Sequence, residues 1–219
     1  MTQYETVSTE AGDARIAWYE GAEGPERATG TKPWAVLALG HGAGGGIEAR
    51  DLQALAAALP ARGVTVALVE QPWRVAGKKV APAPKTLDTG WRGLWPALAR
   101  PGLPVIAGGR SAGARVACRT GRDLGALAVL ALSFPLHPPG RPERSRADEL
   151  LGSGLPTLVV QGGNDPFGRP AEFPEGPYRL VEIPYGDHGL ALPKRAPLGP
   201  DEAMALLADG VAEWILSLR

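Results

Sequence analysis

The stretch Gly108-Gly-Arg-Ser-Ala-Gly-Ala-Arg115 decides how this chain is interpreted. It follows the short apolar run 104–107, which predicts a strand, and it leads into residues 115–119, which favour a helix. The pattern Gly-x-Ser-x-Gly between a strand and a helix is typical of a nucleophile elbow, a sharp turn that holds the serine hydroxyl above the edge of a sheet. Small residues beside the serine let neighbouring backbone pass close to it. Ser111 is therefore the candidate nucleophile.

Apolar runs and helical patterns alternate along most of the chain, and we expect one domain over residues 1–219. The runs 34–39, 64–69 and 126–132 predict buried strands, and 157–160 and 178–183 predict two further strands. The expected helices are 52–59, 87–99, a short one near 145–152, and 201–218 with Asp201 as its cap. Residues 21–32 and 71–86 are expected to be loops, and residues 4–9 and 14–20 to form a hairpin. This order predicts an α/β protein with a doubly wound, mostly parallel sheet and an N-terminal antiparallel hairpin.

Charge and cysteine content restrict the classes of partner and compartment. Lys plus Arg and Asp plus Glu both number 23 among 219 residues, so no basic excess points to nucleic acid or to an anionic membrane. The single cysteine, Cys118, excludes an internal disulfide framework and fits a reducing compartment. Neither a signal peptide nor a membrane-spanning apolar stretch is visible. We expect a cytoplasmic protein, and its oligomeric state is not specified by the sequence.

A serine hydroxyl needs a base, and the base needs an acid that orients it. His188 follows the last expected strand, and Asp165 follows the strand before it, which gives the order Ser…Asp…His. Asp187 adjoins His188 and is a minor rival for the acid, because neighbouring side chains usually diverge. The carboxyl ends of parallel strands meet at one edge of a sheet, so Ser111, Asp165 and His188 are expected to converge there.

Acyl transfer also needs hydrogen-bond donors for the developing oxyanion. We expect one donor to be the backbone N–H of Ala112, at the start of the helix that follows Ser111. The second is expected from the glycine-rich loop 41–46, where Ala43 is the best candidate. The glycines of that loop also fit a plain turn between a strand and a helix.

Further side chains near the expected strand ends are candidates for binding the substrate. Arg110 and the basic loop residues Arg74, Lys78 and Lys79 suit an acidic substrate, or simply form a solvated face. The other candidates are His41, in the glycine-rich turn, and Trp73 and Phe167, which line a pocket or pack in the interior. The sequence has no His-Glu-x-x-His pattern and no Cys/His cluster with ligand spacing, so we expect neither a metal nor a cofactor.

Two other classes of function compete with this interpretation. Gly40-x-Gly42-x-x-Gly45 lies between a strand and a helix, and Glu70 ends the next strand, as in a dinucleotide-binding oxidoreductase. Against this, a hairpin precedes the pattern, the acidic residue comes late, and the serine, aspartate and histidine stay unexplained. A catalytically silent binding or scaffold protein is the other alternative, because a fold does not by itself carry a function.

With these residues the chain resembles the α/β-hydrolase superfamily. More closely, it is similar to the small dienelactone-hydrolase-like branch, which includes the testis-expressed and NSL-complex hydrolase-like proteins. The matching stretches are His41-Gly-Ala-Gly44, Gly108-Gly-Arg-Ser-Ala-Gly-Ala-Arg115, Phe134-Pro-Leu-His-Pro-Pro139, Val160-Gln-Gly-Gly-Asn-Asp-Pro-Phe167 and Gly186-Asp-His-Gly189. The Gly-Arg-Ser-x-Gly and Pro-Leu-His segments carry the resemblance to the branch, and the other stretches are common to the superfamily.

The resemblance implies an α/β-hydrolase fold with Ser111 as nucleophile, Asp165 as acid and His188 as base. It also implies that His137 lies near the site. Many relatives carry a lid domain after the strand that follows the elbow helix, but only residues 133–155 are available here, so no lid and an open site are expected. Dienelactone hydrolases proper use a cysteine nucleophile, so the serine argues against that substrate. The expected activity is cleavage of a small carboxylic ester, thioester or activated amide through an acyl-enzyme, as in a carboxylesterase.

Overall fold

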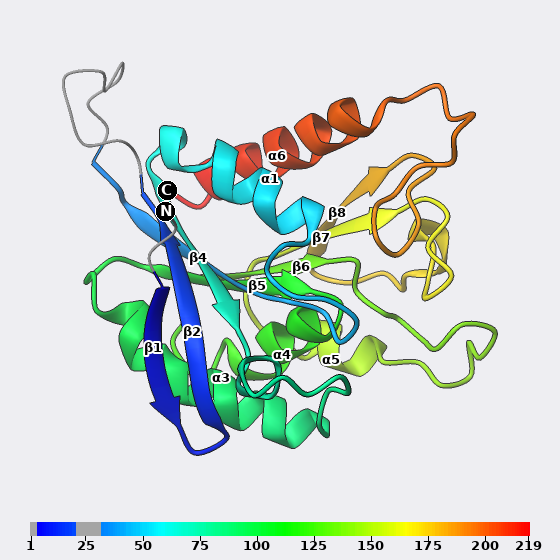
Figure 1. Cartoon of the computed structure of the whole chain (residues 1–219). Coiled ribbons are helices and arrows are strands. Elements are labelled where there is room, and N and C mark those ends of the chain that lie inside the picture. Colours follow the sequence, from blue (N-terminus) through cyan, green and yellow to red (C-terminus); the bar gives the residue numbers. More distant parts are fainter. Residues whose placement is uncertain (1–3, 21–31) are drawn as a thin grey trace.

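Eight strands form one mixed sheet in the computed structural model, which describes residues 4–20 and 32–219 (Figure 1). The strands are β1 (Tyr4–Thr9), β2 (Gly12–Tyr19), β3 (Ala35–Gly40), β4 (Val64–Glu70), β5 (Val105–Arg110), β6 (Ala128–Leu132), β7 (Thr157–Gly162) and β8 (Tyr178–Ile183). Across the sheet they follow the order β1-β2-β4-β3-β5-β6-β7-β8. The β1–β2 and β2–β4 pairs are antiparallel, and the remaining pairs are parallel. The predicted mostly parallel sheet with an N-terminal antiparallel hairpin is confirmed; most of the loop predicted over 21–32 lies outside the described residues.

Helices cover both faces of this sheet (Figure 1). Helices α1 (Arg50–Ala58) and α6 (Pro200–Leu216) lie on one face, and α3 (Pro84–Ala99), α4 (Ala112–Thr120) and α5 (Ala147–Leu151) lie on the other. Alternate residues of β3 serve the two layers: Leu37 and Leu39 pack with α1 and α6, whereas Val36 and Ala38 pack with α3 and α4. This double burial explains why the central strands read as unbroken apolar runs.

Strand β5 runs three residues further than its apolar run predicts and reaches Arg110. A Cβ atom on Gly108 would lie 2.9 Å from the Leu39 side chain, and one on Gly109 would lie 2.5 Å from the Gly40 carbonyl oxygen. The two glycines therefore let β3 and β5 approach closely where the strand ends. Because glycine weakens strand propensity, sequence patterning hides this part of the strand.

The segment predicted as the loop 71–86 contains a short helix, α2 (Pro72–Val75), and α3 begins at Pro84 rather than at residue 87. Both helices have proline in their first turn, where its missing N–H costs nothing. The remaining one-turn elements are the 3₁₀ helices Pro60–Arg62 and Pro170–Glu172.

The cap predicted for the final helix is wrong. Gly199 precedes Pro200 and is the N-cap of α6, which places Asp201 inside the first turn. The Glu202 carboxylate accepts the Gly199 backbone N–H at 3.3 Å. With proline at the first helical position, the cap lies two residues earlier than the aspartate signal indicated.

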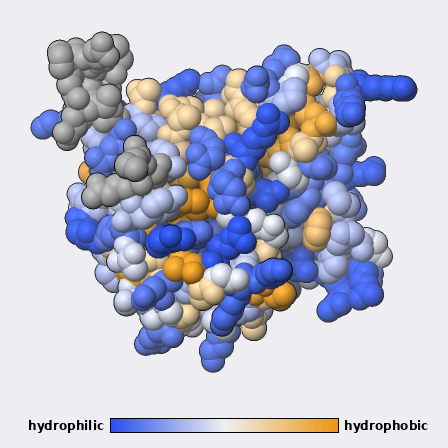
Figure 2. All heavy atoms as spheres, viewed as in Figure 1, coloured by the Kyte–Doolittle hydropathy of each residue, from blue (hydrophilic) through white to orange (hydrophobic). Residues whose placement is uncertain are grey.

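The molecular face drawn in Figure 2 carries mainly hydrophilic side chains, with hydrophobic ones in small separate patches. The larger apolar side chains instead fill the two layers between sheet and helices, with Trp91, Phe134 and Leu94 fully buried on the α3–α5 side. Within residues 4–20 and 32–219, no helix has the length and hydropathy needed to span a bilayer.

Candidate active site

Ser111 occupies the turn between β5 and α4 in a strained backbone conformation. Its φ of 54° and ψ of −109° lie in a region that residues with a side chain rarely adopt. The surrounding structure holds this conformation. The Ser111 backbone N–H donates to the Leu132 carbonyl of β6 at 2.9 Å. A Cβ atom on Gly113 would overlap the Gly40 carbonyl oxygen, so α4 crosses β3 with no room for a side chain. The turn therefore has the geometry of the predicted elbow.

The structure brings Ser111, His188 and Asp165 together at the carboxyl edge of the sheet. The Ser111 Oγ lies 2.9 Å from Nε2 of His188. The opposite ring nitrogen, Nδ1, lies 2.8 Å from Oδ2 of Asp165. One proton arrangement satisfies both contacts: Nδ1–H donates to the carboxylate, and the serine hydroxyl donates to Nε2. The three side chains form one continuous hydrogen-bonded chain across 77 positions of sequence.

Asp165 is completely buried, and both of its oxygens are occupied. Oδ1 accepts the Phe167 backbone N–H at 2.8 Å, as in an Asx turn. Oδ2 accepts Nε2 of Gln161 at 2.8 Å in addition to His188. Gln161 is itself fully buried and also donates to the Gly168 carbonyl at 2.8 Å. Sequence reasoning missed Gln161; its place at the end of β7, four residues before Asp165, is the signal that could have found it.

The neighbouring carboxylate, Asp187, is turned toward its own loop. Its Oδ1 accepts the backbone N–H groups of Gly189 at 2.7 Å and of Ala191 at 2.9 Å. Phe167 stacks on the His188 ring, with 4.1 Å between ring centroids and 29° between planes. Asp187 therefore shapes the loop that carries the imidazole, and Phe167 restricts how the ring can turn.

Arg110 is committed to protein partners rather than to an open surface. One of its terminal nitrogens donates to the His188 carbonyl at 2.9 Å, and its Nε lies 3.1 Å from Oδ2 of Asp51 in α1. Only 16% of the Arg110 side chain and 1% of the Asp51 side chain are exposed. Burial raises the pKa of Asp51, and the Arg110 charge opposes that rise. Arg110 was expected to attract substrate, but its guanidinium instead links α1 to the His188 loop.

The two expected oxyanion donors flank the serine. Ala112 is the first residue of α4, so its backbone N–H has no acceptor within the helix. Ala43 is exposed in the loop after β3, and a Cβ atom on the adjacent Gly42 would lie 3.3 Å from the Ser111 Cβ. The loop thus passes beside the serine with Ala43 on its outer side.

The His41 ring is buried and both of its nitrogens have backbone partners, so neither nitrogen is left to bind a substrate. Its Nε2 accepts the Gln71 N–H at 3.1 Å, and its Nδ1 donates to the Gly42 carbonyl at 2.8 Å. Burial lowers the pKa of this imidazole, which keeps it neutral. His41 therefore ties the loop after β3 to the loop after β4.

His137 reaches the site through Phe167, the residue that stacks on the His188 ring. Its backbone N–H donates to the Phe167 carbonyl at 3.0 Å, but its ring Nε2 lies 3.4 Å from the Glu172 carboxylate and its Nδ1 donates to the Pro138 carbonyl at 3.0 Å. The ring supports the loop that carries Phe167 and Asp165. His137 also lines a hollow of about 450 Å³ together with Asp165, and its expected role in binding substrate stays a prediction.

Trp73, at the start of α2, is 6% exposed and meets the His41 ring edge-on, with 5.5 Å between centroids. Of the basic loop, Arg74 lies 3.5 Å from Glu48, whereas Lys78 and Lys79 are exposed. Of the residues in this loop that were expected to bind substrate, Trp73 is therefore buried beside the glycine-rich turn, and the basic side chains lie at the surface.

Two hollows lie on this side, and the first is lined by residues next to the serine. A crevice of about 10 Å³ is lined by Ala43, Ala112, Trp73, Ala81, Leu87 and Val116. A groove of about 300 Å³ follows, lined by residues that include Gln71, Trp73, Lys78 and Leu87. In the described part of the chain, no three His, Cys, Asp or Glu side chains are grouped as metal ligands.

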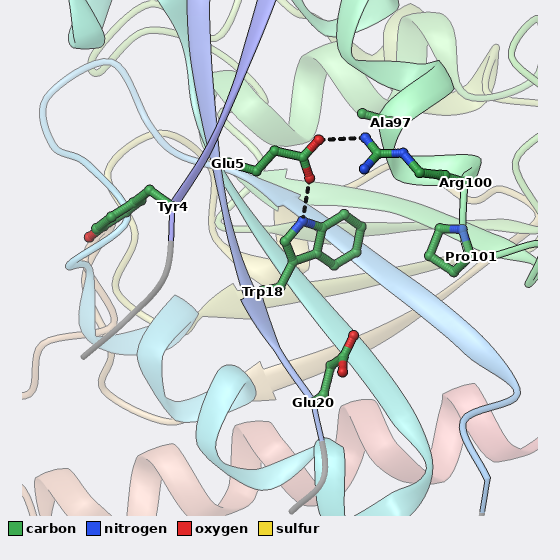
Figure 3. A pocket seen from close by; sticks show the side chains of 7 residues that line it. All are labelled: Tyr4, Glu5, Trp18, Glu20, Ala97, Arg100 and Pro101. Atoms are coloured by element: carbon green, nitrogen blue, oxygen red, sulfur yellow. Dashed lines mark hydrogen bonds and ion pairs between the residues drawn. The ribbon is translucent and has the colours of Figure 1, made fainter. Parts of the chain in front are cut away.

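A more voluminous hollow, of about 850 Å³, is lined by Tyr4, Glu5, Trp18, Glu20, Ala97, Arg100 and Pro101 (Figure 3). Glu5 stands between Trp18 and Arg100 in this hollow and bonds to both, so these polar groups satisfy one another. Arg100 and Pro101 precede β5, which places the hollow toward the amino ends of the parallel strands. It therefore has no part in the candidate site.

Comparison with known proteins places the chain. Residues 33–216 match the family model described as the alpha/beta hydrolase domain. The chain belongs to this α/β-hydrolase family. No curated protein matches its sequence.

This α/β hydrolase also shares its fold with solved structures whose sequences are only distantly similar to its own. A serine hydrolase without a lid from Xanthomonas campestris shares 19% identity at a TM-score of 0.72, covering 97% of this chain and 94% of that one. A dienelactone hydrolase from Anabaena variabilis shares 20% identity at a TM-score of 0.70, covering 99% and 97%. Est1E from Butyrivibrio proteoclasticus shares 15% identity at 0.69, covering 98% of each chain. The predicted α/β-hydrolase fold is confirmed.

The α/β hydrolase has no lid domain in the place where relatives were expected to carry one. Between β6 and β7, all of whose residues the structure describes, α5 is the sole helix or strand. Ser111 is correspondingly half-exposed. The open site predicted from the short segment 133–155 agrees with the lidless description of the Xanthomonas structure.

Proposed function

We propose that this α/β hydrolase is a serine hydrolase that cleaves a small carboxylic ester, thioester or activated amide through an acyl-enzyme. The observation that carries the proposal is the hydrogen-bonded chain Ser111–His188–Asp165, with links of 2.9 and 2.8 Å. These three side chains match in type, order and spacing the arrangement that activates a serine.

In the proposed mechanism His188 removes the hydroxyl proton as Ser111 Oγ attacks the carbonyl carbon. The tetrahedral oxyanion accepts hydrogen bonds from the backbone N–H groups of Ala112 and Ala43. The imidazolium, stabilised by Asp165, then protonates the leaving group as its bond to the carbonyl carbon breaks. Water, deprotonated by His188, attacks the acyl-enzyme, and the serine leaves with a proton. Each cycle returns the serine hydroxyl and the neutral imidazole to their starting state. The proposed binding partner of the protein is a small acyl substrate.

The structural neighbours support ester chemistry. One is described as a thermophilic esterase from Thermogutta terrifontis, and another as a dienelactone hydrolase. This chain has serine where a dienelactone hydrolase proper uses cysteine, so we propose a carboxylesterase of the dienelactone-hydrolase-like branch. The Gly-Arg-Ser-x-Gly and Pro-Leu-His segments support its proposed place beside the testis-expressed and NSL-complex hydrolase-like proteins. The proposed compartment is the cytoplasm.

A test of the nucleophile also separates an enzyme from a silent binding protein. The wild-type chain should cleave p-nitrophenyl acetate and accept a fluorophosphonate label on Ser111. Ser111→Ala should lose both, with kcat/KM down by about 10⁴-fold or more, because the attacking oxygen is gone. Circular dichroism and the melting temperature check that the variant is folded. Retained turnover in folded Ser111→Ala, or a wild type that neither turns over nor labels, contradicts the proposal.

The oxidoreductase alternative has less support. In a dinucleotide-binding fold, the glycine pattern leads directly into the helix whose N-terminus binds the pyrophosphate. Here α1 begins only at Arg50, five residues after Gly45. Glu70, the acidic residue that would bind the ribose, lies 2.7 Å from Arg15 in an ion pair. Gly42 of this loop instead lies beside the serine.

A further inference from the structure

The order of the strands assigns the two halves of a substrate to opposite sides of Ser111. The loops after β3 and β4 lie on one side of β5, and the loops after β7 and β8, which carry Asp165 and His188, lie on the other. His188 must protonate the leaving group, so that group occupies the β7–β8 side. The acyl group, held by the same carbonyl carbon, then points toward the β3–β4 side.

The crevice between Ala43 and Ala112 is the first space that an acyl group meets on that side. Its volume of about 10 Å³ is close to the room that one water molecule needs. Most of the side chains around it are apolar, with Trp73, Leu87 and Val116 all buried, and the two polar ones, His41 and Gln71, are buried and carry no formal charge. The crevice therefore suits a short aliphatic chain without charge.

Beyond the crevice lies the groove of about 300 Å³ beneath the turn of the β1–β2 hairpin. Three residues line both hollows: Gln71, Trp73 and Leu87. Trp73 has the largest side chain of the three, and Pro72 and the His41 ring fix its position at the start of α2. These three residues form the partition between crevice and groove.

We infer that Trp73 is a specificity-determining residue that restricts the acyl group to about the size of acetyl, and that removing its ring joins the crevice to the groove. The inference rests on the proposed function and names its substrate class: esters of short aliphatic acids. Longer chains are rejected because the indole fills the path that their methylene groups would take. Each excluded methylene in such a pocket changes kcat/KM by about tenfold or more.

The test compares kcat/KM for p-nitrophenyl acetate, butyrate and octanoate. The wild type should prefer acetate over octanoate by about tenfold or more. Trp73→Ala should raise the octanoate-to-acetate ratio of kcat/KM by at least about tenfold. Trp73→Leu and Leu87→Ala open the same partition with smaller losses of packing, so they carry the test if Trp73→Ala does not fold. Both should shift the ratio in the same direction.

The matched control is Trp95→Ala. Trp95 is a tryptophan of similar burial, 9% exposed, on α3, and it lines neither hollow. It should lose stability without changing the chain-length ratio. A wild type that cleaves octanoate as well as acetate, or folded partition variants with the wild-type ratio, overturns the inference while leaving the proposed function intact. A wild type that cleaves no ester and takes no fluorophosphonate label overturns the proposed function and the inference with it.

Discussion

At the scale of single residues, the buried Asp51–Arg110 pair matters because Arg110 hydrogen-bonds to the backbone carbonyl of His188 and so helps to position its imidazole. The Arg110 guanidinium extends from the residue before the nucleophile to the His188 carbonyl, 2.9 Å away. Asp51 sits opposite with 1% of its side chain exposed. A charge so buried holds one orientation, and loss of either partner leaves the other uncompensated.

We expect Arg110→Met to lower kcat by about 10- to 100-fold with little change in KM, because the base shifts by a fraction of an ångström while the acyl crevice is untouched. Arg110→Lys should recover part of the loss. The measurement is a full Michaelis profile on p-nitrophenyl acetate together with the melting temperature. Arg92→Met removes a surface pair with Asp123 and should leave both unchanged. An equal kcat for wild type and Arg110→Met would contradict this role.

At the scale of elements, the sequence predicted most where burial alone decides the structure. The runs that became β3, β4 and β6 are apolar because helices cover both faces of the sheet. The prediction failed where one close contact decides: β5 continues through Gly108-Gly109 because β3 and α4 leave no room for side chains there. Glycine signals a turn in isolation, and only the neighbouring strand shows that it extends this one.

The crossing of β3, β5 and α4 gives a prediction at this scale. Gly109→Ala should lower the free energy of unfolding by about 1–3 kcal/mol, since its Cβ would lie 2.5 Å from the Gly40 carbonyl oxygen. It should also abolish ester cleavage, because the turn that holds Ser111 must move. Gly44→Ala is the matched control: nothing lies within 4 Å of the added carbon, so stability should change by less than about 0.5 kcal/mol. Urea unfolding measures both, and equal losses would count against the steric argument.

At the scale of the whole molecule, the convergence of Ser111, Asp165 and His188 could be predicted because parallel strands end at one edge. Their supporting contacts could not. Gln161 donates to Asp165, and Asp51 pairs with Arg110, only because β7 and α1 pack as they do. The place of Gln161 near the end of β7 is a weak local signal, and no local pattern distinguishes Asp51 from other polar residues. His41 shows the opposite error: a histidine in the right loop proved to be a buried link between two loops.

The lone cysteine reports on the integrity of the whole fold. Burial raises the pKa of the Cys118 thiol from 9.0 to about 12, so the native thiol stays neutral at pH 8. We expect no reaction with Ellman's reagent until the chain unfolds, and then one equivalent per chain. Above pH 9 the unfolded thiol ionises while the native one does not, so this group reduces the free energy of unfolding as pH rises toward 12. Cys118→Ala removes the signal, and rapid labelling of the native protein would contradict the burial.

The strand order has a consequence for how such an enzyme changes over evolution. Because β4 and β8 lie on opposite sides of β5, the proposed acyl and leaving-group sides predict that mutations after β4 act on the acid that is recognised and mutations after β8 act on the alcohol. Selection can therefore tune one preference without disturbing the other. A combinatorial library restricted to residues 71–82 would explore new acids while the inherited alcohol tolerance is conserved.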